Sequence, residues 1–123
     1  MKTLLFVGSA QKDIKDFPED VKDDVGYALY EIQLGETPVC AKPFKGLGSG
    51  LLEIIEDFRG DTYRAVCTVK FDERVYVLHC FQKKSKHGVE TPPRDLDLIK
   101  QRLKSAEEDY RANYQVNKRG ESK

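Results

Sequence analysis

The sequence lacks any long hydrophobic run, and this absence narrows the classes of protein open to it. Its N-terminal apolar segment spans only residues 4–7, which is too short for the core of a signal peptide. Elsewhere no apolar stretch approaches the roughly 20 residues that a membrane-spanning helix needs. We therefore expect a cytoplasmic protein that does not associate with a membrane.

Cysteine is scarce, and the common motifs of metal and nucleotide sites are missing. Cys40, Cys67 and Cys80 lie far apart and form no CxxC pair, so neither a disulfide framework nor a zinc site is predicted. Residues 45–50 are rich in glycine but lack the Gly-Lys-Ser/Thr ending of a phosphate loop. No HExxH, EF-hand or GxSxG motif occurs. We expect no metal and no cofactor.

Net charge is also absent, because 21 Lys and Arg balance 21 Asp and Glu. The charges are nevertheless segregated along the chain. Residues 11–37 carry three lysines against eight acids, whereas residues 38–104 carry thirteen basic residues against nine acids. This distribution is compatible with one face that meets a polyanion and another that does not.

The apolar pattern predicts an α+β fold of order β-α-α-β-β-β-α, with an antiparallel-dominated sheet packed against helices. The length of 123 residues fits one domain, which we place at residues 1–115, followed by a disordered tail at 116–123. Residues 36–50, rich in proline and glycine, are expected to form a loop without regular structure. The expected elements are a strand at 3–7, helices from Ala10 and from Pro18 to Gly35, strands at 51–58, 63–70 and 75–82, and a helix after Pro92 and Pro93.

Strict alternation along the last three strands divides their side chains into two faces. The apolar face should pack against the helices; its members are Leu52, Ile54, Phe58, Tyr63, Ala65, Cys67, Val69, Tyr76, Leu78 and Cys80. The other face is mixed, so it is either half covered by another helix or a binding surface. Its members are Glu53, Asp57, Arg64, Thr68, His79 and Phe81, interleaved with Ile55, Val66, Val75 and Val77.

Arg64 is the most informative residue of the mixed face, because it is predicted in the middle of the sheet. One interpretation is a salt bridge to Glu53 or Asp57 on the neighbouring strand. The other is that its guanidinium stabilises the extra negative charge of a pentacoordinate phosphate. The residue pattern leaves both interpretations open.

A basic run follows the last strand and contains Lys83, Lys84, Lys86 and His87. These residues are predicted to lie near Arg64 and His79, where they could grip a phosphate, although a solvated basic loop would look the same. His79 and His87 are the only histidines, one on the sheet and one in a loop. A two-histidine acid–base mechanism is therefore not expected, and Glu53 or a lysine could serve as the base.

Six segments carry a family resemblance between about Leu5 and Leu103. They are Asp16-Phe17-Pro18, Ala28 to Gly35, Lys42 to Gly48, Leu52-Glu53-Ile54, Tyr63 to Val66, and Val77 to Ser85. In this order they resemble the phage-derived branch of the RelE/HigB-like toxins of type II toxin–antitoxin systems. The resemblance implies a RelE-like fold and a ribosome-dependent endoribonuclease that cuts mRNA without a metal, through attack of the ribose 2′-hydroxyl on the adjacent phosphate.

The resemblance also implies roles for residues and partners. Arg64 would stabilise transition-state charge, Lys83 and Lys84 would bind phosphate or transfer a proton, and Glu53 would act as base or orient Arg64. Guidance of the RNA would come from Lys42, Lys45 and Lys86, with His79 and His87 beside them. The implied partners are mRNA on the ribosome and a helix-turn-helix antitoxin.

Two other classes of function fit the same residues. A catalytically inactive RNA- or protein-binding module would use the same basic sheet face and bind RNA in a salt-sensitive way without cleaving it. A purely structural domain would form a stable complex with another protein and show no affinity for RNA.

Overall fold

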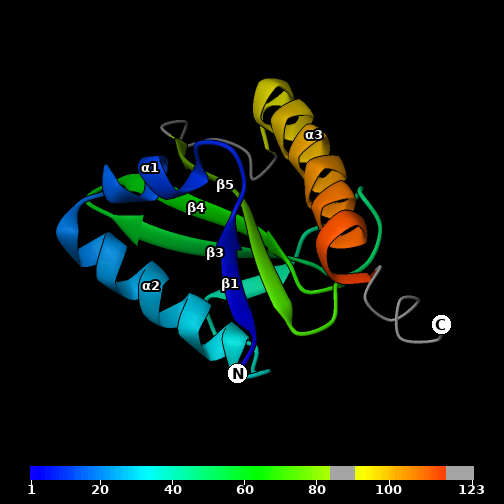
Figure 1. Ribbon diagram of the computed structural model, residues 1–123. Coiled ribbons are helices and arrows are strands. Elements are labelled where there is room, and N and C mark those ends of the chain that lie inside the picture. The colour runs from blue at the N-terminus through cyan, green and yellow to red at the C-terminus, as the bar shows by residue number, and fades with distance from the viewer. Residues whose placement is uncertain (84–90, 116–123) are drawn as a thin grey trace, which may run out of the picture.

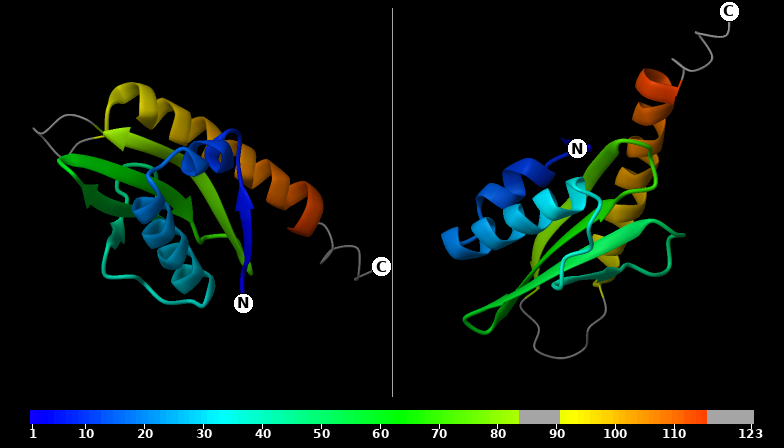
Figure 2. Two further views of the ribbon diagram at one scale, coloured as in Figure 1. Left: turned by 90° about the vertical axis from the view of Figure 1, so that its left-hand side faces the viewer. Right: turned by 90° about the horizontal axis from the view of Figure 1, so that it is seen from below.

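The computed structural model describes residues 1–83 and 91–115, which form a five-stranded sheet with helices on both faces (Figures 1 and 2). The strand order is β1-β5-β4-β3-β2, in which β1 pairs with β5 in parallel and the other pairs are antiparallel. The elements are β1 (Thr3–Phe6), α1 (Ala10–Lys15), α2 (Glu19–Gln33), β2 (Ala41–Pro43), β3 (Leu51–Phe58), β4 (Asp61–Thr68), β5 (Arg74–Lys83), α3 (Pro93–Tyr110) and a π-helical turn (Arg111–Gln115).

The predicted α+β fold and its element order are confirmed, with one strand more than expected. The expectation that residues 36–50 contain no regular element is wrong, because Ala41–Pro43 pair with β3. The strand lies at the edge of the sheet, where the N–H that Pro43 lacks is not required. This short strand places Lys42 directly opposite Glu53.

A two-residue turn joins β3 to β4 and fixes their register. Arg59 and Gly60 both have positive φ, at 52° and 88°, as a type I′ turn requires. The turn pairs Phe58 with Asp61 and, further along the hairpin, Ile55 with Arg64. It therefore determines which side chains meet in the middle of the sheet.

Helices α1 and α2 cover one face of the sheet and α3 covers the other (Figure 2). The first layer is closed by the apolar stripe of α2, namely Val21, Val25, Ala28, Leu29 and Ile32. The second layer is closed by the apolar stripe of α3, in which Ile99 and Ala106 are buried and Leu96, Leu103 and Tyr110 are partly buried.

A bulge in β5 overturns part of the predicted face assignment. Val66 pairs with His79, whereas the next residue, Cys67, pairs with Val77, so Leu78 is the extra residue. Tyr76 and Leu78 consequently join the α3 layer, and Val75 and Val77 join the α2 layer. Strict alternation misplaced these four residues because a bulge reverses the faces of the residues on one side of it.

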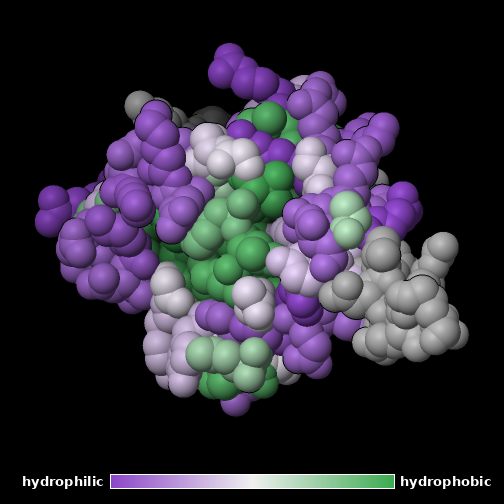
Figure 3. Space-filling model, viewed as in Figure 1, coloured by the Kyte–Doolittle hydropathy of each residue, from purple (hydrophilic) through white to green (hydrophobic). Residues whose placement is uncertain are grey.

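In the part of the chain that the structure describes, no helix is long and apolar enough to cross a membrane. Figure 3 shows hydrophilic residues gathered over α1 and α2, and a band of hydrophobic residues between these helices and α3. The band lies over β1, whose residues Leu4, Leu5 and Phe6 are only partly buried.

Candidate active site

The sheet register brings the predicted polar residues to the face that α3 covers. Glu53 lies between Lys42 and Val66, and Val66 in turn pairs with His79. In the next rows, Arg64 pairs with Phe81, and Thr62 pairs with Lys83. Because residues two apart on a strand share a face, Glu53, Arg64, His79 and Lys83 all point to one side of the sheet.

Arg64 and Glu53 form a buried ion pair at the centre of this face. The Nη1 of Arg64 donates a hydrogen bond of 2.8 Å to Oε2 of Glu53, and the two side chains are only 6% and 5% exposed. A charge this deeply buried requires a partner, because removal from water costs several kcal/mol per ion. The pair therefore fixes the position of the Glu53 carboxylate.

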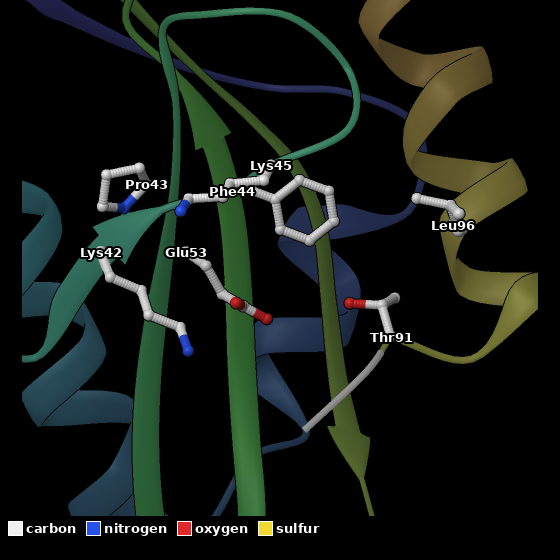
Figure 4. A pocket seen from close by; sticks show the side chains of 7 residues that line it. All are labelled: Lys42, Pro43, Phe44, Lys45, Glu53, Thr91 and Leu96. Carbon is white, nitrogen blue, oxygen red and sulfur yellow. The ribbon is translucent and has the colours of Figure 1, made fainter. Parts of the chain in front are cut away.

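An open pocket of about 630 Å³ lies over one end of the ion pair (Figure 4). It is lined by Lys42, Pro43, Phe44, Lys45, Glu53, Thr91 and Leu96. Figure 4 shows the Glu53 carboxylate between the Lys42 side chain, which comes from β2, and Thr91, which lies just before α3. Lys42 and Lys45 are exposed, so two ammonium groups are available at the mouth of a pocket whose inner wall carries a carboxylate.

Arg64 and Lys83 lie on the same face but do not line the pocket. All three of Glu53, Arg64 and Lys83 are buried, at 4%, 5% and 7% exposed, but Glu53 alone among them lines the pocket. Arg64 reaches the pocket through Glu53, which it holds. Lys84, Lys86 and His87, which the sequence analysis assigned to catalysis or RNA binding, lie outside the described residues.

His79 is occupied by contacts with α3 and with its own strand. Its Nε2 lies 2.7 Å from Oδ1 of Asp95 in the first turn of α3, and its ring stacks on Phe81 with centroids 4.8 Å apart. Only 6% of the residue is exposed. In this arrangement His79 fastens the start of α3 to the sheet, next to the pocket wall formed by Leu96.

Arg102 is a central residue that the sequence analysis did not single out. Its guanidinium donates to the Leu78 carbonyl in the bulge at 3.0 Å and to Ser9 Oγ at 2.9 Å. Ser9 Oγ donates in turn to Asp13 of α1 at 2.7 Å. The signal that could have found Arg102 is its place three residues after Ile99 and four before Ala106, on the buried stripe of an otherwise polar helix.

Burial and a second carboxylate raise the pKa of Glu56 to about 7, but this group lies away from the pocket. The largest cause is desolvation, followed by a hydrogen bond with Asp24 and repulsion from Asp24 and Asp57. Glu56 pairs with Tyr63, which belongs to the α2 layer. The raised pKa therefore reflects the contact between α2 and the sheet.

The cysteines behave as packing residues where they are buried. Burial raises the pKa of both Cys67 and Cys80 to about 12, so their thiols stay protonated at neutral pH. Across residues 1–83 and 91–115, no cluster of three or more His, Cys, Asp or Glu side chains could hold a metal ion.

The protein is an α+β domain with a mixed sheet and a carboxylate-bearing pocket on its α3 face, and its sequence shows the family. Residues 12–104 match the family described as phage-derived protein Gp49-like (DUF891). The chain belongs to this family, which confirms the phage-derived group named from the sequence. No curated protein matches the sequence.

Two solved structures similar to this chain are toxins or contain one. The toxin–antitoxin complex RelBE2 from Mycobacterium tuberculosis matches with 19% identity and a TM-score of 0.48, over 68% of this chain and 93% of the other. A double mutant of the E. coli toxin RelE in its free state matches with 18% identity and a TM-score of 0.49, over 64% of this chain and 80% of the other.

Proposed function

We propose that this protein is the toxin of a toxin–antitoxin system and acts as a metal-independent endoribonuclease on mRNA at the ribosome. The observation that carries the proposal is the Glu53 carboxylate, fixed by Arg64 at 2.8 Å and facing a pocket with Lys42 and Lys45 at its mouth. A fixed base beside a cationic phosphate site is what cleavage by a ribose 2′-hydroxyl requires. Membership of the phage-derived Gp49-like family supports it.

In the proposed reaction, Glu53 accepts the proton of the 2′-hydroxyl as its oxygen attacks the adjacent phosphorus. The P–O5′ bond breaks and the leaving 5′-oxygen takes a proton from water, so the products are a 2′,3′-cyclic phosphate and a 5′-hydroxyl. Lys42 and Lys45 hold the phosphate, since their ammonium groups favour its added negative charge. Arg64 acts as a positioning residue because its Nη1 is bound to the carboxylate.

Lys83 and His79, which the sequence also singled out, have indirect roles in this proposal. Lys83 ends β5 on the same face of the sheet as Glu53, so its positive charge lies on the side that would meet the RNA. His79 maintains the pocket wall through Asp95. The proposed partner is an antitoxin, with the helix-turn-helix class expected from the sequence.

Growth arrest on induced expression tests the proposal. The wild-type chain should arrest a bacterial culture, and the double variant Lys42→Ala/Lys45→Ala should not. Both lysines are exposed, so the double variant should fold normally; Lys104→Ala, on an exposed part of α3, is the matched control. A soluble wild-type protein that leaves growth unchanged would count against the proposed toxin function.

The burial of Arg64 favours one alternative, an inactive module that binds RNA or protein through the same face. The Arg64 side chain is 6% exposed and its Nη1 is bound to Glu53, so it does not offer a free guanidinium to a phosphate. The module would bind RNA with an affinity that falls steeply with salt, and it would leave the RNA intact when translating ribosomes are present. Intact RNA together with salt-sensitive binding would select this alternative.

A further inference from the structure

The outer side of α2 carries an apolar stripe that no other element among the described residues covers. Tyr27 is 63% exposed, Tyr30 is 44% exposed and Leu34 is 46% exposed, although aromatic and leucine side chains gain most from burial. The two tyrosine rings lie beside each other with centroids 6.2 Å apart. Figure 2 shows α2 as the outermost layer on its face of the sheet, and the exposed positions alternate with the buried stripe of the helix that faces the sheet.

The spacing of this stripe is that of a helix–helix seam. Asp20, Asp23, Tyr27, Tyr30 and Leu34 follow one another at intervals of three, four, three and four residues, which places them along one line on the helix. We call these five residues the α2 outer stripe. A second helix packs on such a line by inserting its own side chains between them.

The charge of α2 specifies what the second helix must carry. The helix contains five acids against one lysine, and that lysine, Lys22, is 3.4 Å from Glu19 of the same helix. Asp20 and Asp23 form the negatively charged N-terminal half of the α2 outer stripe, and Tyr27, Tyr30 and Leu34 form its apolar half. Figure 3 shows hydrophilic residues over α1 and the N-terminal part of α2.

We propose that the α2 outer stripe is the docking surface for a basic amphipathic helix of another protein. Leucine-like side chains of that helix would pack between Tyr27, Tyr30 and Leu34, and its lysines or arginines would face Asp20 and Asp23. A second copy of this chain fits poorly. A parallel α2 pair would place aspartate against aspartate, and an antiparallel pair would place aspartate against the apolar half.

A helix docked on the α2 outer stripe would leave the pocket open. The stripe lies on the α2 side of the sheet, whereas the pocket lies on the α3 side (Figure 2). A partner helix can therefore be held here without entering the pocket. The inference goes beyond the proposed nuclease, since docking does not require Glu53 or the pocket lysines.

The test uses two synthetic helical peptides about four heptads long, each with leucine at the a and d positions. One peptide carries lysine at the flanking positions and the other carries glutamate. Binding to the whole chain is measured by fluorescence anisotropy. The lysine peptide should bind at least about tenfold more tightly than the glutamate peptide, and Tyr27→Ala/Tyr30→Ala should weaken its binding about tenfold or more, as expected for two exposed aromatic anchors.

Charge reversal provides the second arm of the test. Asp20→Lys/Asp23→Lys should reverse the preference, so that the glutamate peptide binds more tightly than the lysine peptide. Glu108→Lys, at an exposed position on α3, should leave the preference unchanged. Equal binding of both peptides, or unchanged binding by the tyrosine variant, would overturn the proposal. A wild-type dimer in sedimentation that Tyr27→Ala/Tyr30→Ala dissociates would also overturn it, because a second copy would then cover the stripe. All outcomes are independent of nuclease activity, which Lys42→Ala/Lys45→Ala tests separately.

Discussion

At the residue scale, the ion pair between Arg64 and Glu53 combines a structural and a functional role. Both groups are buried, so each stabilises the charge of the other against desolvation. The carboxylate in addition faces the pocket. A change at either residue therefore affects stability and the proposed chemistry together, and the two effects have to be separated by measurement.

Arg64→Ala should lower the free energy of unfolding by about 3–5 kcal/mol, because it leaves a buried carboxylate without its guanidinium. The double variant Arg64→Met/Glu53→Leu should recover most of this loss, since an apolar pair of similar volume needs no partner. Urea unfolding of the three proteins measures both effects. A double variant no more stable than Arg64→Ala would mean that the pair is not the source of the loss.

The carboxyl group of Glu56 should make stability depend on pH. Burial and Asp24 raise its pKa to about 7 from the ordinary value of 4.5, so folding favours the protonated form. The contribution to stability is complete below the unfolded pKa and is lost as the pH rises through about 7. The free energy of unfolding should therefore fall between about pH 5 and pH 8 in the wild type.

The variant Glu56→Gln should flatten this decline, because glutamine keeps a neutral side chain at every pH. Denaturant unfolding at a series of pH values measures the slope. Glu36→Gln, at an exposed position after α2, serves as the control and should retain the wild-type slope. If the free energy of unfolding falls equally with pH in Glu56→Gln and in the wild type, a group other than Glu56 causes the decline.

At the element scale, Arg102 joins α3 to β5 and to Ser9, the residue before α1, through two hydrogen bonds. Replacement by methionine keeps the apolar stem but leaves the Leu78 carbonyl of the bulge without this charged donor. We expect Arg102→Met to lower the free energy of unfolding by about 2–4 kcal/mol, because the variant loses two hydrogen bonds donated by a charged group.

Lys104→Met, on an exposed position of the same helix, should change stability by no more than about 0.5 kcal/mol. Chemical unfolding of both variants provides the comparison. Similar stability of Arg102→Met and Lys104→Met would show that Arg102 does not hold the elements together.

The elements were predictable from sequence where a local pattern determines them. The stripe of α2 and the strand at 51–58 follow from apolar spacing, and Glu53 and Arg64 were placed on one face correctly. The bulge at Leu78 and the pairing of Ala41–Pro43 depend on contacts between strands distant in sequence, so alternation within one strand could not reveal them. The bond between His79 and Asp95 likewise depends on how α3 crosses the sheet.

At the scale of the whole molecule, the sheet separates two surfaces of different character. The α2 side is acidic and carries the exposed tyrosines, whereas the α3 side holds the ion pair and the lysine-lined pocket. The zero net charge of the chain hides this division. The charge segregation read from the sequence anticipated it, although the contributing residues come from distant segments.

The pocket itself could not be predicted from the sequence. Its walls come from β2, β3, the segment before α3 and the first turn of α3, and only the tertiary fold brings Lys42, Glu53 and Leu96 together. The identity of the candidate lysines came from the family resemblance. Their position beside Glu53 comes from the structure.

Cleavage of mRNA on purified translating ribosomes tests the central claim most directly. Ends are mapped on the RNA, and their chemistry is read by sensitivity to a phosphatase before and after opening of the cyclic phosphate with acid. The account predicts fragments ending in 2′,3′-cyclic phosphate for the wild type and for Lys104→Ala, and at least about a hundredfold slower cleavage for Glu53→Gln, in line with loss of a general base. Intact mRNA with folded wild-type protein, or undiminished cleavage by Glu53→Gln, would contradict it.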